Sequence, residues 1–568
     1  MERDPVPLDR PSLQGRASVL QLLRFVGRRT GLALADRVMT TPLLRWAWSG
    51  LADTGYVPGL AEFRPSDREA VRDMMAGRYL LAFKLVDTHG ASPFSVEPDN
   101  PDWHNSLHGF GWLRHFRDVR DAASRGFARM LVLDWIATEG DYDPATWTLS
   151  LTAQRVMNWL RQLDLLLEDA SPEEQKTITR AIGTQVQSLR NRRRFAYDPV
   201  ERLLAVAALV AAELCSDGQD SGGETGIEER LRELDLLLAR QLDADGMHLS
   251  RNPRVQLTLL IELASLGRSL INHKTDSTLE FAAQVERMHE ALDAVTLGSG
   301  EPAYFNGCGH VALDTLVAVQ ANAARKRHGS GAVGGYGILR DGEAVVVADS
   351  GLVPPLEHAH AAHDSALAFE FSHGTELIVG SCGPAPADWT QNRDLFRQAM
   401  AHTAPCVDDR GAANLNTRGP YAGSLAPRAE AEPIEIHPED HLMLLRATGW
   451  QSAGITLERR LTLLSQGTTL VGQDKVLRAG DRQPEGLVSL RFHLAPGIVV
   501  HRTGEAMVRL VLPNGAKWNF LWEGGTVFED DSVRQSAYFG FQRTRQIVIE
   551  AEARDGLELA WIFTRESP

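Results

Sequence analysis

Apolar residues recur at helical spacing through the first part of the chain, from about Ser18 to Ala323. Apolar positions at i, i+3, i+4 and i+7 line one face of an α-helix, and that face is expected to pack against neighbouring elements. Four segments show the pattern: Arg117 to Ala137, Leu151 to Leu167, Pro199 to Leu214 and Val255 to Leu270. Many helices in succession without strands between them predict a bundle, a solenoid or a toroid of helical hairpins.

The pattern changes after about Gly329, where short β-branched or alternating runs are separated by turn residues. Such runs predict the strands of an all-β sandwich. They cover Ala344 to Ala348, Ala366 to Phe371, Glu376 to Val379, Leu442 to Ala447, Leu457 to Leu464, Leu487 to Leu494, Met507 to Leu512 and Gln546 to Glu552. We therefore predict a helical extension over residues 1–60, a helical domain over 61–325 and an antiparallel β-sandwich over 326–568. The sandwich could also serve only to pack against the helices.

Composition and charge narrow the class of protein. With 568 residues, 43% of them apolar and 23% charged, the chain is typical of a globular protein with two or more domains. The net charge of −15 argues against non-specific nucleic-acid binding, which requires a wide positive field, and an anionic ligand would need a local basic cluster. The four cysteines form no CxxC pair, which argues against a zinc ribbon or a disulfide framework and favours a reducing compartment.

No run of about 18 apolar residues could span a bilayer, and the first residues form no apolar signal segment. We therefore expect a cytoplasmic protein without a transmembrane segment. If a signal peptide had been removed, a periplasmic location would follow instead.

Four segments carry motifs that are considered as a set, in the order in which they occur along the chain: Trp103 to Leu113, Asp245-Gly-Met-His248, His363 to Glu370, and Ala401-His-Thr403. In this order they resemble the toroid-entry segment, the Asp-Gly-Ser turn, the His-Ala-Asp-x-Leu-Ser-Phe-Glu strand and the Ala-His-Asn/Thr segment of heparinase II/III-type polysaccharide lyases. The resemblance implies an incomplete (α/α) toroid followed by an antiparallel β-sandwich. It also implies β-elimination on a uronate-containing glycan, in the cleft between the two domains.

Elimination requires a group that neutralises the uronate carboxylate, a base for the C5 proton and an acid for the departing oxygen. The resemblance implies an Asn or His and a Tyr from the toroid, with His from the sandwich. This chain has Glu201-Arg202 and Val255-Gln256 at the matching toroid positions. The predicted catalytic residues are instead nearby polar side chains: His248 or Tyr304 as the base, Asn252 or Arg251 at the carboxylate, and His363 from the sandwich.

Three of the four predicted catalytic residues of the toroid also have a structural interpretation. Asn252 precedes Pro253, which is typical of a helix N-cap followed by proline at the first helical position. His248 could cap a helix or fill a surface groove, and Tyr304 could be a packed aromatic residue.

Three histidines fall within six residues, at His358, His360 and His363. Neutral imidazoles are both metal ligands and general acid–base groups near pH 7. In an extended chain His358 and His360 would share one face, and His363 would point to the other.

The resemblance implies that His363 and His402 bind a structural zinc ion. The position of the third ligand, an Asp in relatives, holds Gly380-Ser381. A tetrahedral zinc site would then need a substitute ligand, such as Asp364, His360 or Cys382. Histidines that only satisfy backbone groups at a domain interface are the alternative.

An anionic poly- or oligosaccharide is the expected partner, and a homodimer is a further expectation. The residues predicted to contact the saccharide are Glu201, Arg202, Asn306, Trp103 and His360. Tryptophans at helical spacing, however, are more often core residues.

Two other functions stay open. A glycoside hydrolase is favoured by Glu201 and the nearby carboxylates Asp198, Asp245 and Glu370. A non-catalytic glycan-binding or assembly protein is favoured by the missing tyrosine and metal-binding Asp.

Overall fold

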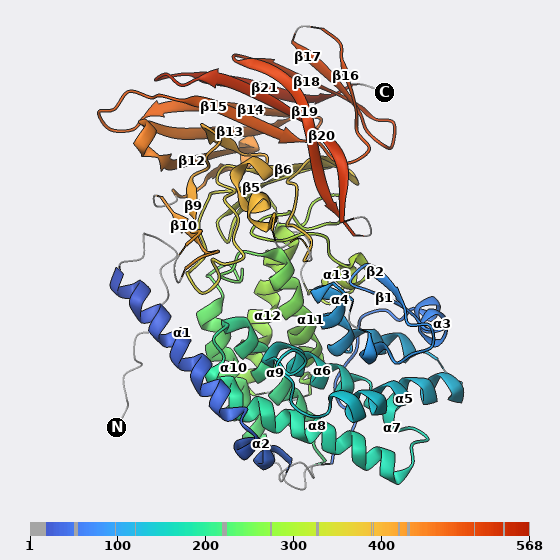
Figure 1. Cartoon of the computed structure of the whole chain (residues 1–568). Coiled ribbons are helices and arrows are strands. Elements are labelled where there is room, and N and C mark those ends of the chain that lie inside the picture. The colour runs from blue at the N-terminus through green and yellow to red at the C-terminus, as the bar shows by residue number, and fades with distance from the viewer. Residues whose placement is uncertain are drawn as a thin grey trace.

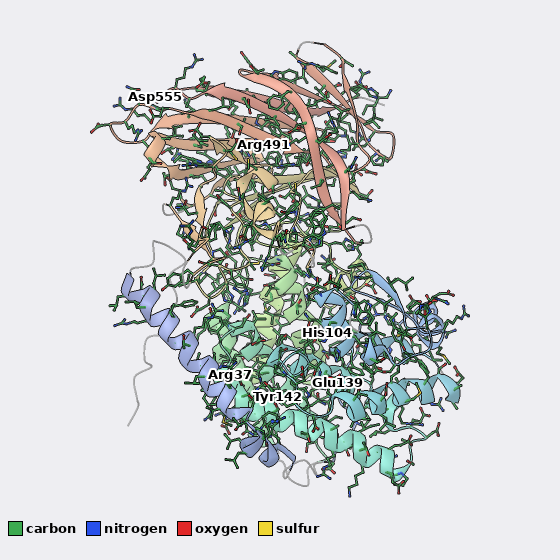
Figure 2. The ribbon with its side chains drawn as sticks, viewed as in Figure 1. Arg37, His104, Glu139, Tyr142, Arg491 and Asp555 are labelled. Carbon is green, nitrogen blue, oxygen red and sulfur yellow. The ribbon has the colours of Figure 1, made fainter. Side chains whose placement is uncertain are left out.

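The computed structural model describes residues 19–49, 55–96, 98–119, 121–217, 224–272, 275–324, 329–387, 389, 391–418, 421–428, 432–504, 506–537 and 540–566. Figure 1 shows helices gathered at one end of the molecule and β-sheets at the other. His104 and Glu139 mark the helical part in Figure 2, and Arg491 and Asp555 mark the β part. The predicted order of an (α/α) toroid and an antiparallel β-sandwich is confirmed.

The helical part contains α1 (Val19–Met39), α2 (Pro42–Ser49), α3 (Arg68–Met75), α4 (Pro101–His108), α5 (Ala122–Glu139), α6 (Leu149–Arg161), α7 (Leu163–Leu167), α8 (Pro172–Arg192), α9 (Pro199–Leu214), α10 (Glu224–Gln241), α11 (Pro253–Ser269), α12 (Asp276–Ala294) and α13 (Leu313–Gln320). The helix predicted over Leu151 to Leu167 is divided into α6 and α7. The helical pattern did not indicate a hairpin of two short strands, β1 (Arg78–Leu81) and β2 (Lys84–Asp87).

Helix α9 lies at the centre of the helical part. Asp198 caps it by accepting a hydrogen bond from the backbone nitrogen of Val200 at 2.8 Å, and Pro199 takes the first helical position. Every residue from Leu203 to Ala212 is buried. A helix that is apolar on all sides must be surrounded by other helices, and α9 contacts α6, α8, α10 and α11.

The β part contains β3 (Gly331–Val333), β4 (Tyr336–Asp341), β5 (Ala344–Asp349), β6 (Phe369–His373), β7 (Glu376–Val379), β8 (Pro405–Val407), β9 (Ala413–Leu415), β10 (Leu425–Pro427), β11 (Glu435–His437), β12 (Leu442–Trp450), β13 (Ile455–Leu464), β14 (Thr469–Arg478), β15 (Leu487–His493), β16 (Val499–Arg502), β17 (Met507–Val511), β18 (Lys517–Glu523), β19 (Thr526–Ser536), β20 (Gly540–Glu552) and β21 (Glu558–Arg565). The larger sheets are antiparallel, in the orders β11-β12-β13-β14-β21-β18-β17-β16, β19-β20-β15-β8 and β3-β4-β5-β6-β7. Strands β9 and β10 form a separate hairpin.

The five-stranded sheet joins the two parts of the molecule. Strand β5 is buried along its whole length, and its side chains alternate between two apolar clusters. Val346 belongs to the core of the sandwich, whereas Val345 and Val347 pack with Met247 and Phe305 from the helical part. The toroid and the sandwich are therefore docked through an apolar interface, so residues of both can contribute to one site.

Helix α1 runs along the outside of the molecule and reaches both parts (Figure 1). Asp36 accepts hydrogen bonds from Arg192 of α8 at 2.8 and 3.0 Å. The ring of Phe25 lies 5.8 Å from that of Tyr197 in the toroid and 6.3 Å from that of Tyr421 in the β part. None of the helices that the structure describes is long and apolar enough to cross a membrane.

Candidate functional site

Arg251, predicted to bind a substrate carboxylate, instead links the toroid to the sandwich. Its guanidinium group donates hydrogen bonds to the carbonyls of Gly334 at 2.8 Å and Gly335 at 2.9 Å, and to that of Leu352. It also donates to the carboxylate of Asp349 at 2.7 Å. Only 1% of Arg251 is exposed. Because each guanidinium nitrogen bonds to the β part, none is available to a bound sugar.

His248, a predicted base, is fully buried at the same junction. Its Nδ1 lies 2.8 Å from the hydroxyl of Ser250, and its Nε2 lies 3.1 Å from the side-chain oxygen of Gln241. The ring packs edge-on against that of His358 in the β part, with 4.9 Å between centroids. Burial lowers the pKa of His248 well below 6.5. With both nitrogens engaged and no exposed surface, His248 packs the junction and does not reach a ligand.

Asn252 is the N-cap of α11, as its structural interpretation predicted. Its side-chain oxygen accepts a hydrogen bond from the backbone nitrogen of Arg254 at 2.9 Å, and Pro253 is the first helical residue. Its amide nitrogen and the Nε2 of His363 both lie beside Gly307. A Cβ atom added to Gly307 would lie 3.3 Å and 3.7 Å from these two nitrogens.

Asn306 and His402 lie next to this pair, so that Asn252, Asn306, His363 and His402 form a histidine cluster at the domain junction. Asn306 donates to the hydroxyl of Tyr336 at 2.8 Å and accepts from the backbone nitrogen of His363 at 3.4 Å. The Nδ1 of His363 lies 3.1 Å from the Nε2 of His402. Burial lowers the pKa of His402 to about 3 and that of His363 well below 6.5. Both rings are therefore neutral at pH 7.

The histidine cluster does not fit a tetrahedral zinc ion. Among the described residues, no group of three His, Cys, Asp or Glu side chains is arranged to hold a metal. His363 and His402 bond to each other, and Asp364 accepts a hydrogen bond from the backbone nitrogen of Ala413 at 3.1 Å. The pair alone supplies two of the four ligands that a structural zinc requires.

Tyr304, the other predicted base, is buried beneath a cation. The guanidinium carbon of Arg534 lies 4.0 Å from the centre of its ring, and the hydroxyl donates to Glu301 at 3.2 Å. Burial raises the pKa of Tyr304 well above 10. A tyrosine base would have to lose its proton, whereas this environment holds Tyr304 as the neutral phenol.

Glu201 and Arg202 lie in the first turn of α9, close to the histidine-rich segment. Burial raises the pKa of Glu201 to about 7, and the charge of Asp198 adds to the effect. Burial lowers the pKa of His358 to about 4, although Asp198 acts in the opposite direction.

Residues 356–360 form turns and not a strand. The predicted alternation is therefore wrong, because His358 is buried and His360 is exposed.

The expectation that Trp103 contacts the saccharide is not met. Trp103 is fully buried, and its indole nitrogen donates to the carbonyl of Tyr79 at 3.3 Å, so it presents no face to a sugar. Three of the four carboxylates considered for hydrolysis, all except Glu201, make internal contacts or are fully buried. Asp198 caps α9, Asp245 accepts from the backbone nitrogen of Gly334 at 3.1 Å, and Glu370 is fully buried.

An open cavity lies inside the helical part, between the β1–β2 hairpin, the 3-10 helix η2 (Gly111–Phe116), α6 and α11. Its volume is about 440 Å³, within the range of small-molecule binding sites. The side chains that define its chemistry are charged or aromatic: Phe83, Trp112, Arg114, Arg254, Glu262 and His310. The cavity borders the segments that were predicted to hold the catalytic residues. Arg254 directly follows Pro253 in the sequence. The Nδ1 of His310 lies 2.8 Å from the carboxylate of Glu301, which accepts a hydrogen bond from Tyr304.

Of these cavity residues, sequence reasoning considered only Trp112, as a surface for stacking a sugar ring. Arg254 and His310 are two and three positions beyond Asn252 and Gly307, so nearness to the selected segments could have identified them. Phe83 gives no such signal, because the hairpin turn that presents it contains no glycine or asparagine.

The fold and the junction between its domains define a protein of polysaccharide-lyase architecture, an (α/α) toroid docked onto an antiparallel β-sandwich. Residues 323–562 match the family described as Heparinase II/III-like, C-terminal, which confirms the resemblance noted in the sequence.

Among solved structures, heparinase III is 12% identical with a TM-score of 0.67, covering 95% of this chain and 91% of that one. A mutant of the heparan sulfate lyase HepC from Pedobacter heparinus is 13% identical with a TM-score of 0.56, covering 96% and 91%. At these identities the likeness shows the fold alone. In sequence, the chain is 26% identical over 533 residues to FtsZ-localized protein C of Caulobacter vibrioides, covering 88% of this chain and 90% of that protein.

Proposed function

We propose that this protein uses the polysaccharide-lyase fold to bind an acidic saccharide without cleaving it, and that it acts as an assembly protein on FtsZ. The observation that carries the proposal is the use of the predicted catalytic groups in buried contacts of the domain junction. Elimination needs a base at the C5 proton and a cation at the carboxylate of a bound uronate. Arg251, His248 and Tyr304 would reach such a sugar only if the toroid and the sandwich separated.

Similarity to FtsZ-localized protein C supports the assembly role. The similarity extends over 88% of the chain and therefore includes the toroid as well as the sandwich. A shared single module would have covered one part only. The open cavity of the toroid supports the saccharide-binding role, because Arg254 is accessible in its lining, whereas Arg251, His248 and Tyr304 are buried.

Co-sedimentation with FtsZ tests the assembly role directly. We expect the full chain to pellet with FtsZ polymers formed with GTP and to stay in the supernatant with FtsZ held in GDP. In parallel, the protein is incubated with heparan sulfate, polygalacturonate and alginate, and ultraviolet absorbance is followed for unsaturated products. Absence from the FtsZ pellet would contradict the assembly role, and a growing ultraviolet signal would contradict the non-catalytic role.

A uronate lyase is a second candidate, because the histidine cluster stays together beside Gly307. In that case the Nε2 of His363 takes the C5 proton, the electrons of the C5–H bond form the C4=C5 double bond, and the C4–O bond breaks. The departing oxygen then takes the proton back from His363. Any ultraviolet signal should be lost in His363→Ala and kept in His501→Ala, since His501 is exposed on β16 and outside the cluster. A signal unaffected by His363→Ala would exclude this mechanism.

A further inference from the structure

Helix α1 lies on the outside of the molecule (Figure 1), and an apolar stripe runs along its outward side. This α1 stripe consists of Leu20, Leu23, Gly27, Gly31, Leu34 and Val38. Between 50% and 63% of each of its leucines and its valine is exposed. We infer that the α1 stripe is the interface of a homodimer, in which two copies of the chain pack their α1 helices side by side in opposite directions.

The other side of α1 holds the helix on the body of the protein. The ring of Phe25 packs against that of Tyr197, and the guanidinium carbon of Arg29 lies 4.7 Å from the centre of the same ring. Asp36 accepts hydrogen bonds from Arg192. At 3.6 residues per turn, these contacts lie about 180° around the helix from the α1 stripe. Helix α1 therefore has two contact faces, and the body of the protein uses one of them.

Gly27 and Gly31 leave the middle of the α1 stripe open to a close neighbour. A Cβ atom added to either glycine would meet no atom of the described chain within 4 Å. Glycine in a helix interior costs about 1 kcal/mol relative to alanine, but it allows another backbone to approach closely. A second helix can therefore pack here at an interaxial distance of about 8 Å, the short end of the usual range.

The α1 stripe is nearly symmetric along its length. Two large apolar residues precede the two glycines and two follow them, at spacings that are almost the same on both sides of residue 29. A two-fold axis beside residue 29 therefore places each glycine opposite a glycine of the second copy, and Leu23 opposite the partner's Leu34. An interface with two-fold symmetry must be self-complementary in this way.

Opposite directions are favoured over a pair of helices that run in the same direction. In the same direction Arg24 would stand beside its equivalent in the second copy, and the two helix dipoles would repel. In opposite directions the two copies of Arg24 are separated by about 15 Å along the helix axis. Arg28, nearer the centre, lies 3.7 Å from Glu357 of its own chain.

The shape of the α1 stripe favours a helix over a lipid surface as its partner. A helix that lies in a membrane interface buries a wide apolar face of large side chains. Between Leu23 and Leu34 the α1 stripe has only glycines, so its middle would insert no side chain into lipid. A second α1 fits this depression, because its own glycines let the two backbones meet there.

Sedimentation equilibrium of the full chain tests the dimer at concentrations from about 1 to 100 µM. A single pair of helices is at the low end of interface sizes, so we expect a dissociation constant in the micromolar range. The mass should rise reversibly from 62.5 kDa toward twice that value. Helix α1 carries four arginines and one aspartate, so the two copies repel, and added salt should tighten the dimer.

Gly27→Leu separates the interface from the folding of α1. Leucine is a better helix former than glycine, but its side chain prevents the close approach of a second helix. We expect at least tenfold weaker dimerisation with an unchanged circular dichroism spectrum. Ala33→Leu is the matched control, because it adds the same side chain at an exposed position about 120° away from the α1 stripe. This control should dimerise like the wild type.

Cysteine cross-linking tests the direction of packing, since the four native cysteines are buried. An oxidised mixture of Leu23→Cys and Leu34→Cys should form a covalent dimer faster than either variant alone. A monomer throughout the concentration range, an undiminished dimer in Gly27→Leu, or faster cross-linking of Leu23→Cys alone than of the mixture would overturn the inference. Flotation with phosphatidylglycerol vesicles that Gly27→Leu strengthens would assign the α1 stripe to a lipid surface and would overturn it as well. Self-association through α1 does not depend on the proposed binding of a saccharide or of FtsZ, but it would give an assembly protein two copies of each binding surface.

Discussion

Replacing Arg251 by alanine should destabilise the docking of the toroid on the sandwich, because the substitution leaves a buried carboxylate without its cation. Asp349 is 1% exposed and accepts from Arg251 at 2.7 Å. Removing one partner of a buried ion pair costs about 3–5 kcal/mol. Arg251 has a φ of 54°, and alanine at this position has the same unfavourable backbone conformation, so the change reports on the side chain.

Three backbone carbonyls, those of Gly334, Gly335 and Leu352, also lose a donor in this variant. Each unsatisfied acceptor costs about 1–3 kcal/mol when it stays buried, but water can enter the space left by the side chain. We therefore expect a total loss of about 4 kcal/mol in the free energy of unfolding. If Arg251 served only a substrate, the loss would be that of an ordinary surface substitution, within about 0.5 kcal/mol.

Urea denaturation followed by tryptophan fluorescence measures this loss, with Arg268→Ala as the exposed control on α11. The double variant Arg251→Ala/Asp349→Asn removes the buried charge. The amide oxygen then accepts from the Gly351 nitrogen, and the amide nitrogen donates to the Ser365 hydroxyl, which accepts in place of donating. This double variant should therefore recover at least about 1 kcal/mol of the loss. A loss below about 1 kcal/mol in Arg251→Ala, or no recovery in the double variant, would refute the reasoning.

Three other predictions concern stability. Asn252→Ala should cost about 1 kcal/mol in urea denaturation through loss of the α11 cap, whereas Asn252→Asp should keep the cap; equal losses would show that the cap is unimportant. His108 accepts a hydrogen bond from Trp135 at 3.0 Å, and burial lowers its pKa to about 3. As pH falls below about 6.5 the unfolded chain binds this proton first, so the folded state loses stability. Relative to His108→Asn, the wild type should lose about 2 kcal/mol between pH 6 and pH 4, and parallel pH profiles would contradict this. Gly246 has a φ of 86°, and a Cβ atom there would lie 2.5 Å from the backbone carbon of Arg287. Gly246→Ala should therefore lower the free energy of unfolding by more than about 2 kcal/mol, and a smaller effect in thermal denaturation would show that the turn can adjust.

Sequence patterns predicted the architecture because they report local geometry. Helical and alternating periodicities follow from the repeat of each element. The central position of α9 was not predicted, because Pro199 to Leu214 was assigned one apolar face, whereas the structure buries every residue from Leu203 to Ala212. The N-cap of α11 was predicted from the sequence, because Asn252 and Pro253 act on backbone groups of neighbouring residues. The division of Leu151 to Leu167 into α6 and α7, and the β1–β2 hairpin, were not evident from periodicity.

The periodicities of the sequence therefore determined that a helical domain precedes an antiparallel sandwich, and the family resemblance of four segments implied the toroid and the place where these segments meet. Only the tertiary structure decided what the polar residues of those segments do. Arg251 bonds to Asp349, and His248 packs on His358, across separations of about a hundred residues, so their burial follows from how the two parts dock. Whether an arginine or a histidine is accessible depends on that docking, because the same side chain can bind a ligand in water or satisfy backbone carbonyls in the interior.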